Sequence, residues 1–179
     1  VHGFIGKQLT SETELVALDR THMRSFLRAY QAFGAQYILH RRKVILGDEM
    51  GLGKTIQALA VAAHMAVEGD EHALVVCPAS VLINWSNETR KHTWLRAYEL
   101  HGPSRDSAAA QWGRRGGVAI TTFNTLSLLQ LSVVPKLVII DEAHYIKNQE
   151  AKRSVASRRW IESAQRVVLL TGTPMENRV

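Results

Sequence analysis

The sequence predicts an open, mostly parallel α/β sheet with helices on both faces. Its short apolar runs do not alternate with polar residues, which is typical of strands buried on both sides. These runs lie at residues 44–46, 73–77, 97–100, 118–122, 136–140 and 166–170. The chemically distinctive residues follow the ends of the strands, and ligands of such sheets bind at that edge. We therefore expect one ligand crevice along the carboxyl edge of the sheet.

Segments of helical character separate the strands, as a parallel sheet requires. The expected helices cover residues 23–39, 55–65, 81–94, 107–112, 124–131 and 151–163. Residues 1–22 are weakly patterned, so we expect a lead-in segment there and one domain over residues 23–179.

Composition excludes several classes of protein. Hydrophobic residues are 46% of the chain and charged residues 21%, an ordinary globular balance. No apolar run approaches the length of about 18 residues that spans a bilayer, so we expect an intracellular protein without a membrane partner. It would be cytoplasmic in a bacterium and nuclear in a eukaryote. Cys77 is the only cysteine, which excludes an internal disulfide.

The net charge of +6 and the pI near 9.8 favour a polyanionic partner such as nucleic acid. The basic clusters at residues 41–43 and 114–115 are equally compatible with solvated faces.

The most informative stretch reads G-D-E-M-G-L-G-K-T-I-Q at residues 47–57, between a predicted strand and a predicted helix. Gly51 and Gly53 let the backbone curl so that its N–H groups and the helix N-terminus point at one place, which favours an anion. Lys54 adds a charge for the β- and γ-phosphates, and the Thr55 hydroxyl is a ligand for Mg²⁺. Asp48 occupies the position of the first glycine in the usual pattern. The alternative is an ordinary turn with an exposed lysine.

Two carboxylates, Asp141 and Glu142, follow a strongly apolar run. Adjacent buried carboxylates are costly unless a positive charge is near, and a Mg²⁺ ion bound to nucleotide phosphates supplies one. Asp141 is then suited to the metal shell and Glu142 to orienting or deprotonating a water molecule. The alternative is a helix start with an acidic first turn.

Other strand ends carry weaker signals. The turn from Pro78 to Ser80 precedes a predicted helix and is suited to a nucleic-acid phosphate, or is an ordinary turn. Thr171 and Thr173 place two hydroxyls where they could sense a γ-phosphate, although any Ser/Thr turn would look the same. Gln31, in the first helix, offers a donor and an acceptor to an adenine edge, and a solvent-facing glutamine is the alternative.

Together these segments resemble motifs of the superfamily II helicase-like ATPases. Five motifs of that superfamily, I, Ia, Ic, II and III, are similar to the stretches at 47–57, 75–85, 120–126, 141–148 and 169–178. Their residues, including Asp48, resemble the forms found in the Swi/Snf branch. The resemblance covers about residues 23–179 and implies a RecA-like P-loop NTPase domain that uses ATP and Mg²⁺ on double-stranded DNA.

The resemblance also implies residue roles. Catalytic roles fall on Lys54, Asp141 and Glu142, and metal binding on Thr55 and Asp141. The residues it assigns to the nucleotide are Gln31, Asp48, Glu49, Met50, Gly51, Leu52, Gly53, Lys54, Thr55 and Ile56. Those it assigns to DNA are Pro78, Ser80, Thr121 and Thr122, with Thr171 and Thr173 coupling nucleotide to DNA movement.

Relatives of this kind have two RecA-like lobes, and the second supplies arginines that complete the ATP site. We expect this chain to be the first lobe, monomeric by itself. Because an arginine finger is worth about 10³ to 10⁵ in rate, we expect weak nucleotide binding and little turnover without the second lobe.

Three other functions stay open at this point. A strand-separating DNA or RNA helicase shares the phosphate loop and the acidic pair. A non-catalytic docking module for nucleic acid or protein has no need of Lys54 or Glu142. A small-metabolite kinase leaves residues 171–177 without a role.

Overall fold

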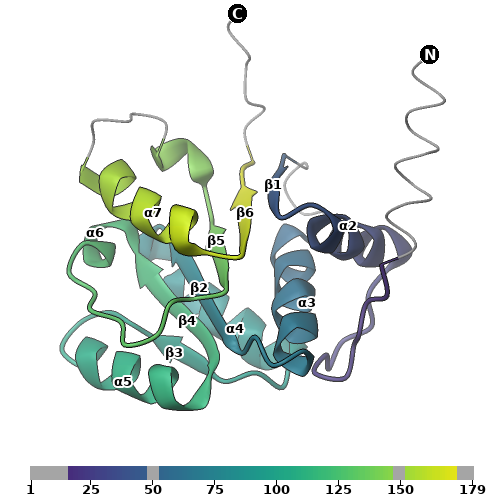
Figure 1. Ribbon diagram of the computed structural model, residues 1–179, viewed down its shortest axis with the longest axis horizontal. Coiled ribbons are helices and arrows are strands. Elements are labelled where there is room, and N and C mark those ends of the chain that lie inside the picture. The colour runs from purple at the N-terminus through teal and green to yellow at the C-terminus, as the bar shows by residue number, and fades with distance from the viewer. Residues whose placement is uncertain (1–15, 48–52, 147–151, 173–179) are drawn as a thin grey trace, which may run out of the picture.

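The computed structural model describes residues 16–47, 53–146 and 152–172. Its centre is a six-stranded parallel sheet in the order β1-β6-β5-β2-β4-β3 (Figure 1). The strands are β1 (Lys43–Leu46), β2 (His72–Cys77), β3 (Ala97–Glu99), β4 (Gly117–Thr122), β5 (Leu137–Ile140) and β6 (Arg166–Leu170). The six strands predicted from the sequence are all present, each within about one residue of its expected bounds.

The strand register aligns the carboxyl ends at one edge. Leu46 of β1 is paired with Leu170 of β6, and Ile140 of β5 is paired both with Leu169 of β6 and with Val76 of β2. Neighbouring strands lie about 4.8 Å apart, so the ends of β1 and β5 are separated by roughly 10 Å. The phosphate-loop stretch and the acidic pair therefore open on the same edge of the sheet.

Helices cover both faces of the sheet, as predicted. One face carries α2 (Ala29–His40), α3 (Lys54–Val67) and α4 (Leu82–His92), and the other carries α5 (Arg105–Arg115), α6 (Phe123–Leu126) and α7 (Lys152–Ser163). Two 3-10 turns, η1 (Ala79–Val81) and η2 (Ala143–Ile146), follow β2 and β5. In the part of the chain that is described, every helix is too short or too polar to cross a bilayer.

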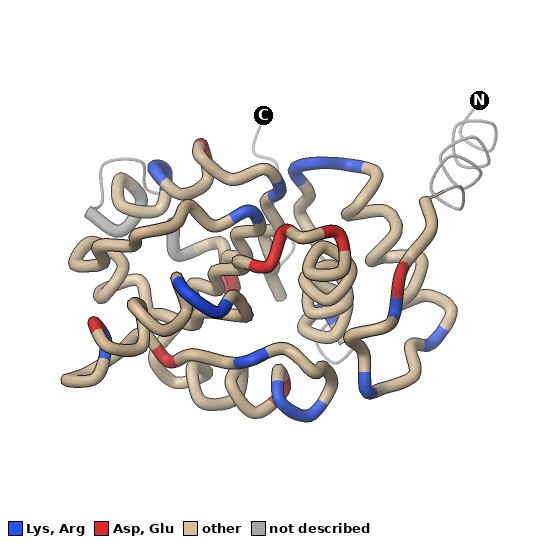
Figure 2. Tube along the Cα trace, turned by 60° about the horizontal axis from the view of Figure 1, so that its bottom comes forward, with Lys and Arg blue, Asp and Glu red and all other residues tan. Residues whose placement is uncertain are grey.

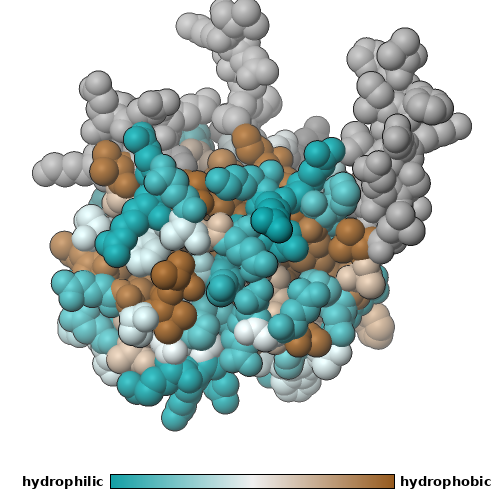
Figure 3. Space-filling view, in the orientation of Figure 1, coloured by the Kyte–Doolittle hydropathy of each residue, from teal (hydrophilic) through white to brown (hydrophobic). Residues whose placement is uncertain are grey.

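The strands supply side chains to two apolar cores because their residues alternate between the faces. Val75 and Ile139 join the core under α2, α3 and α4, whereas Leu74 and Val138 join the core under α5, α6 and α7. All four are fully buried, which explains why the sequence shows continuous apolar runs. Apolar and polar side chains are interspersed on the outer surface of the face in Figure 3, an ordinary distribution.

The first helix begins later than predicted. Residue 23 is extended instead of helical, because Met23 forms an antiparallel bridge with Thr93 and the Arg24 N–H donates to the His92 carbonyl. Phe26, which the helical pattern counted as apolar and inward, is 99% exposed. The segment at 16–28 runs across the outside of α3 and α4 before α2 starts.

Among the other helices, α5 and α6 differ most from the predicted lengths. α5 runs over Arg105–Arg115, longer than the expected 107–112. α6 ends at Leu126 instead of reaching residue 131, because the next N–H groups, those of Leu128 and Leu129, form short turn hydrogen bonds to Thr125 and Leu126.

Candidate nucleotide site at the carboxyl edge of the sheet

The phosphate-loop stretch enters the described structure at Gly53. This glycine has a left-handed backbone, with φ 76° and ψ 40°, and is the N-cap of α3. A side chain at this position would strain the backbone and would also meet Gln31, whose Nε2 lies 2.6 Å from where a Cβ atom would be. The sequence needs glycine here for two reasons. Asp48, Glu49, Met50, Gly51 and Leu52 lie outside the described residues.

Gln31 lies against this loop, although the two segments are far apart in the sequence. Its Oε1 accepts a hydrogen bond from the Arg28 N–H at 2.9 Å, which caps the start of α2, and its Nε2 points toward Gly53. One half of the amide thus fixes the helix and the other half faces the loop. The contact with adenine stays a prediction.

Helix α3 presents its first turn at the sheet edge. Lys54 and Thr55 are its first two residues and are partly exposed, whereas Ile56 is buried at 8% exposure. The N–H groups and the dipole at the start of this 14-residue helix favour an anion. Ile56 therefore anchors the turn in the core, while Lys54 and Thr55 are left at the surface where a phosphate would lie.

Asp141 follows β5 on the face that carries α3 and α4. Its register partner in β2 is the position of Cys77, and the alternation that sends Ile139 into the core under those helices also turns Asp141 to their side. Its Oδ1 accepts from the Glu142 N–H at 2.9 Å, and its Oδ2 accepts from the indole N–H of Trp85 at 2.8 Å. Each carboxylate oxygen therefore has one N–H donor and keeps a further lone pair.

Glu142 has an unusual backbone. Its φ of 53° is the one left-handed angle at a non-glycine residue in the described part of the chain. Such a conformation costs about 1 kcal/mol or more and clusters at functional sites. The Glu142 side chain is 39% exposed, and its Oε2 lies 3.1 Å from Nδ1 of His144. The strained backbone thus turns a carboxylate outward beside a partly buried one.

Cys77 ends β2 beside Asp141. Its side chain is fully buried and its Sγ–H donates to the Thr121 carbonyl at 3.6 Å. Burial, together with the nearby charge of Asp141, raises the pKa of the Cys77 thiol to about 12. The thiol therefore stays neutral near pH 7, which lowers its reactivity as a nucleophile.

The residues at this edge suit a magnesium ion that is also bound by phosphate. Asp141 and Thr55 offer hard oxygen donors, which Mg²⁺ prefers. Within the described ranges, no group of three or more His, Cys, Asp or Glu side chains is placed to enclose a metal. Mg²⁺ characteristically keeps few protein ligands and takes others from nucleotide phosphates, so the donor set fits a Mg²⁺-nucleotide better than a free ion.

Thr171 lies between the ends of β1 and β5. Its N–H donates to the Leu46 carbonyl at 3.1 Å, and the residue is only 2% exposed. It thereby ties the end of β6 to the strand that leads into the phosphate loop. Thr173 lies outside the described residues.

The four residues expected to face DNA divide into two pairs. Ser80 is exposed and Pro78 partly so, in the turn η1 that leads from β2 to α4. Thr121 and Thr122 are buried, and their hydroxyls bond to the Leu100 carbonyl and to Thr125 respectively. Because Thr121 has no exposed surface, a DNA contact from this segment would need another group. The exposed residue there is Asn124.

Two residues near the site were not predicted from the sequence. Trp85 is 1% exposed and donates to Asp141, although the sequence placed it only within a helix. Gln57 is 2% exposed, and its Oε1 lies 2.0 Å from where a Cβ of Gly34 would be, so it packs directly on α2. Trp85 is far from Asp141 in the sequence, and Gln57 is far from Gly34, so no local sequence pattern could have predicted either contact.

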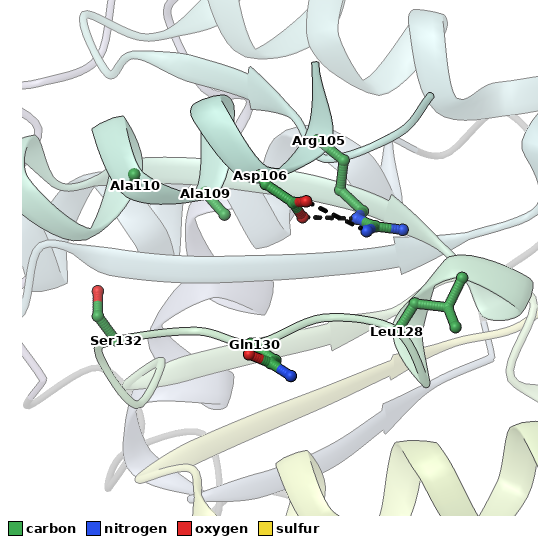
Figure 4. Close-up of a pocket in the computed structure, with 7 residues that line it drawn as sticks. All are labelled: Arg105, Asp106, Ala109, Ala110, Leu128, Gln130 and Ser132. Atoms are coloured by element: carbon green, nitrogen blue, oxygen red, sulfur yellow. Dashed lines mark hydrogen bonds and ion pairs between the residues drawn. The ribbon is translucent and has the colours of Figure 1, made fainter. Parts of the chain in front are cut away.

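A separate pocket of about 370 Å³ lies between α5 and the 128–132 segment (Figure 4). Its charged groups are Arg105 and Asp106, which pair with each other at 2.8 Å. None of the residues predicted for the nucleotide lines it, so it is not part of the site.

Basic residues are dispersed over several elements instead of forming one stripe (Figure 2).

Comparison with known proteins shows the family of the chain. A model of the SNF2-related domain family matches residues 30–179. The chain is 34% identical over 184 residues to the SWI/SNF-related matrix-associated actin-dependent regulator of chromatin subfamily A-like protein 1 of Xenopus laevis, covering 96% of this chain and 18% of that protein. It is 37% identical over 171 residues to helicase swr1 of Emericella nidulans, covering 87% and 10% respectively. The chain spans less than a fifth of either relative.

The fold has a solved counterpart. The Sulfolobus solfataricus SWI2/SNF2 ATPase core, determined in complex with dsDNA, matches 90% of this chain and 35% of its own with a TM-score of 0.78 and 32% identity. This likeness confirms the predicted RecA-like fold, and the family match confirms the resemblance inferred from the motifs. The chain therefore belongs to the SNF2-related domain family, the Swi/Snf branch of helicase-like ATPases.

Proposed function

We propose that this chain is the first ATP-binding lobe of a DNA-dependent ATPase that moves along double-stranded DNA. The observation that carries the proposal is the convergence of three chemical groups on one sheet edge. Three groups lie at the carboxyl ends of aligned strands: the first turn of α3, the Asp141 carboxylate, which accepts two hydrogen bonds, and the outward-facing carboxylate of Glu142.

Each group has a role in phosphoryl transfer to water. Lys54 would neutralise the β- and γ-phosphates, and the N-terminus of α3 would bind their oxygens. Thr55 and Asp141 would hold the Mg²⁺ ion, which supplies charge stabilisation for the leaving phosphate. Glu142 would orient the attacking water and accept its proton, and Gln31 would select adenine through its Nε2.

DNA would lie across the same edge of the sheet. The support is the dsDNA bound to the Sulfolobus ATPase core and the position, just after β2, of the exposed Ser80 and the partly exposed Pro78. Thr171, hydrogen-bonded to β1, and Thr173 would couple the nucleotide to DNA movement. Thr122 would act indirectly, by capping α6 through its bond to the Thr125 N–H.

A second lobe would complete the enzyme. This chain matches 35% of the Sulfolobus core, so most of that protein has no counterpart among the residues matched here. In P-loop ATPases an arginine supplied across the cleft contributes about 10³ to 10⁵ in rate. We therefore propose that this lobe binds Mg·ATP weakly by itself, as a monomer, and turns over only with its second lobe and DNA.

Nucleotide binding tests the proposal. Calorimetry with Mg·ATP and a non-hydrolysable analogue is done on the wild type, on Lys54→Ala, and on Arg114→Ala as a control for lost charge far from the edge. We expect binding by the wild type and the control but not by Lys54→Ala. Equal binding by all three would overturn the assignment of the cleft.

A second experiment addresses the polymer. In a form that carries both lobes, ATPase activity is measured with duplex DNA, single-stranded DNA and double-stranded RNA. Stimulation by duplex DNA supports a translocase, whereas stimulation by RNA or a strand-separation signal supports a helicase. No hydrolysis with any polymer, despite binding, would favour a docking module.

A further inference from the structure

We propose that Trp85 is a positioning residue for the Asp141 carboxylate. Nothing in the motif pattern gives this residue a role beyond packing. The inference rests on the proposed function, since Asp141 needs a fixed orientation only if it serves a bound Mg²⁺-nucleotide.

The contact is short and partly buried. Trp85 lies in the first half of α4, is 1% exposed, and donates its indole N–H to Oδ2 of Asp141 at 2.8 Å. The other oxygen, Oδ1, accepts from the Glu142 N–H at 2.9 Å. The Trp85 indole and the Glu142 N–H thus fix both side-chain torsions of Asp141, which would otherwise rotate freely at the end of β5.

The chemistry of indole suits this task. It donates one hydrogen bond and accepts none, so it cannot take a proton from the carboxylate or compete with it for a cation. A hydrogen bond to a charged acceptor is stronger than one between neutral groups, and strongest where water is excluded. Each oxygen of Asp141 keeps a lone pair, so the Trp85 bond orients the carboxylate without occupying it.

Helix α4 is itself held firmly, which makes it a suitable support. Ser86, next to Trp85, is fully buried and donates its hydroxyl to Oε1 of Glu99 on β3 at 2.6 Å. One turn later the Thr89 hydroxyl donates to the Trp85 carbonyl at 2.8 Å. The ring is also part of the apolar core under α2, α3 and α4. A rigid donor holds its acceptor at a lower entropic cost than a mobile one.

The competing explanation is that Trp85 only fills the core and that its N–H found the nearest acceptor. The chain provides a matched control for this. Trp112 is also fully buried and donates its indole N–H, at 3.0 Å, to a backbone carbonyl, that of Gly117, under the opposite face of the sheet. Replacing either tryptophan by phenylalanine removes one indole and one buried hydrogen bond, but only one of them touches Asp141.

The experiment measures nucleotide affinity with and without magnesium. The 179-residue chain, as wild type, Trp85→Phe and Trp112→Phe, is titrated with Mg·ATP and separately with ATP in EDTA, up to millimolar concentrations and followed by NMR. We expect Trp85→Phe to weaken Mg·ATP binding about tenfold and to leave binding in EDTA within about twofold. Trp112→Phe should change neither affinity by more than about twofold.

A second variant covers the risk that Trp85→Phe loses its fold. The tryptophan analogue in which sulfur replaces the indole N–H keeps the shape of the ring and removes only the donor. Incorporated at position 85, it should give the same tenfold loss. In the wild type, the Trp85 indole N–H resonance should move when Mg·ATP is added, whereas that of Trp112 should stay in place.

The possible outcomes separate the two proposals. If the wild type binds Mg·ATP and the sulfur analogue binds equally well, or if both phenylalanine variants lose the same affinity, Trp85 is a packing residue and this inference fails alone. If the wild type binds no nucleotide at all, the proposed function fails and takes this inference with it.

Discussion

At the residue scale, the site gathers unusual states of ordinary residues: a strained glutamate, a neutral cysteine beside a carboxylate, and a carboxylate held by an indole. Glu142 combines an unfavourable backbone conformation with a proposed role in activating water. A left-handed backbone at a non-glycine residue is unfavourable, yet here it turns a carboxylate away from the sheet.

Replacing Glu142 should separate the strain from the chemistry. Glu142→Gly and Glu142→Ala both remove the carboxylate and its contact with His144. Only glycine relieves the left-handed strain, so we expect the glycine variant to be more stable than the alanine variant by about 1 kcal/mol. Urea unfolding measures the difference. Equal stabilities would mean that the backbone at this position carries no strain.

Cys77 should make stability depend on alkaline pH. Its pKa is raised to about 12 in the folded protein, against about 8.5 for an ordinary thiol. The folded state therefore binds the proton more tightly, and the resulting stability is complete below about pH 8.5 and is lost as the pH rises toward 12. We expect unfolding free energy to fall across this range more steeply in the wild type than in Cys77→Ala.

The same burial predicts a simple chemical result. Iodoacetamide at pH 8 should leave Cys77 unmodified in the native protein and alkylate it in urea, because only the unfolded chain exposes a thiolate. Mass spectrometry reads the outcome directly, since Cys77 is the only cysteine. Rapid alkylation without urea would show that this end of β2 opens readily.

At the element scale, the strands were predictable and the helix ends were not. Strand positions followed from uninterrupted apolar runs such as that of β5, which reflect burial on both faces. The start of α2 was misjudged because Met23 and Phe26 fit a helical period. Their positions are set by a bridge to Thr93 and by exposure to solvent, both of them long-range or tertiary facts.

The contact between α2 and α3 gives a test at this scale. Gly34 of α2 leaves room for the buried side chain of Gln57 of α3, whose Oε1 lies 2.0 Å from where an added Cβ would be. Gly34→Ala should therefore destabilise the protein by about 1 to 3 kcal/mol despite the better helix propensity of alanine. Adding Gln57→Ala should cancel much of this loss in a double-mutant cycle. Additive effects would show that the two residues are not in contact.

In the candidate site, too, the local motifs were predictable from the sequence but the contacts between separate elements were not. Lys54, Thr55, Asp141 and Glu142 could be proposed from the sequence because glycines and paired acids leave a local signature, and their roles stay predictions. The support they receive, from Trp85 and from the Gln31 amide against Gly53, joins residues from separate elements. Thr121 was expected at a surface and is buried, because its place in β4 faces the interior.

At the scale of the whole molecule, β6 connects β1 to the rest of the sheet. β6 lies between β1 and β5 in the sheet, and Thr171 after it bonds back to Leu46. A chain ending at Ala164 would lack this strand and should lose cooperative unfolding, whereas a chain ending at Gly172 keeps all six and should retain it. Denaturant curves followed by circular dichroism distinguish the two. A cooperative transition in the shorter chain would contradict the expectation.

The strand order also has a consequence for how the protein is made. Within the described residues, β1 pairs with β6 alone, in a register that joins Lys43 to Val167. A ribosome therefore releases the phosphate-loop strand long before its partner exists, and closing so long a loop is slow compared with forming local helices. Nascent chains should pass through synthesis without a formed nucleotide cleft, which would appear only when β6 pairs with β5 and so brings β1 into the sheet.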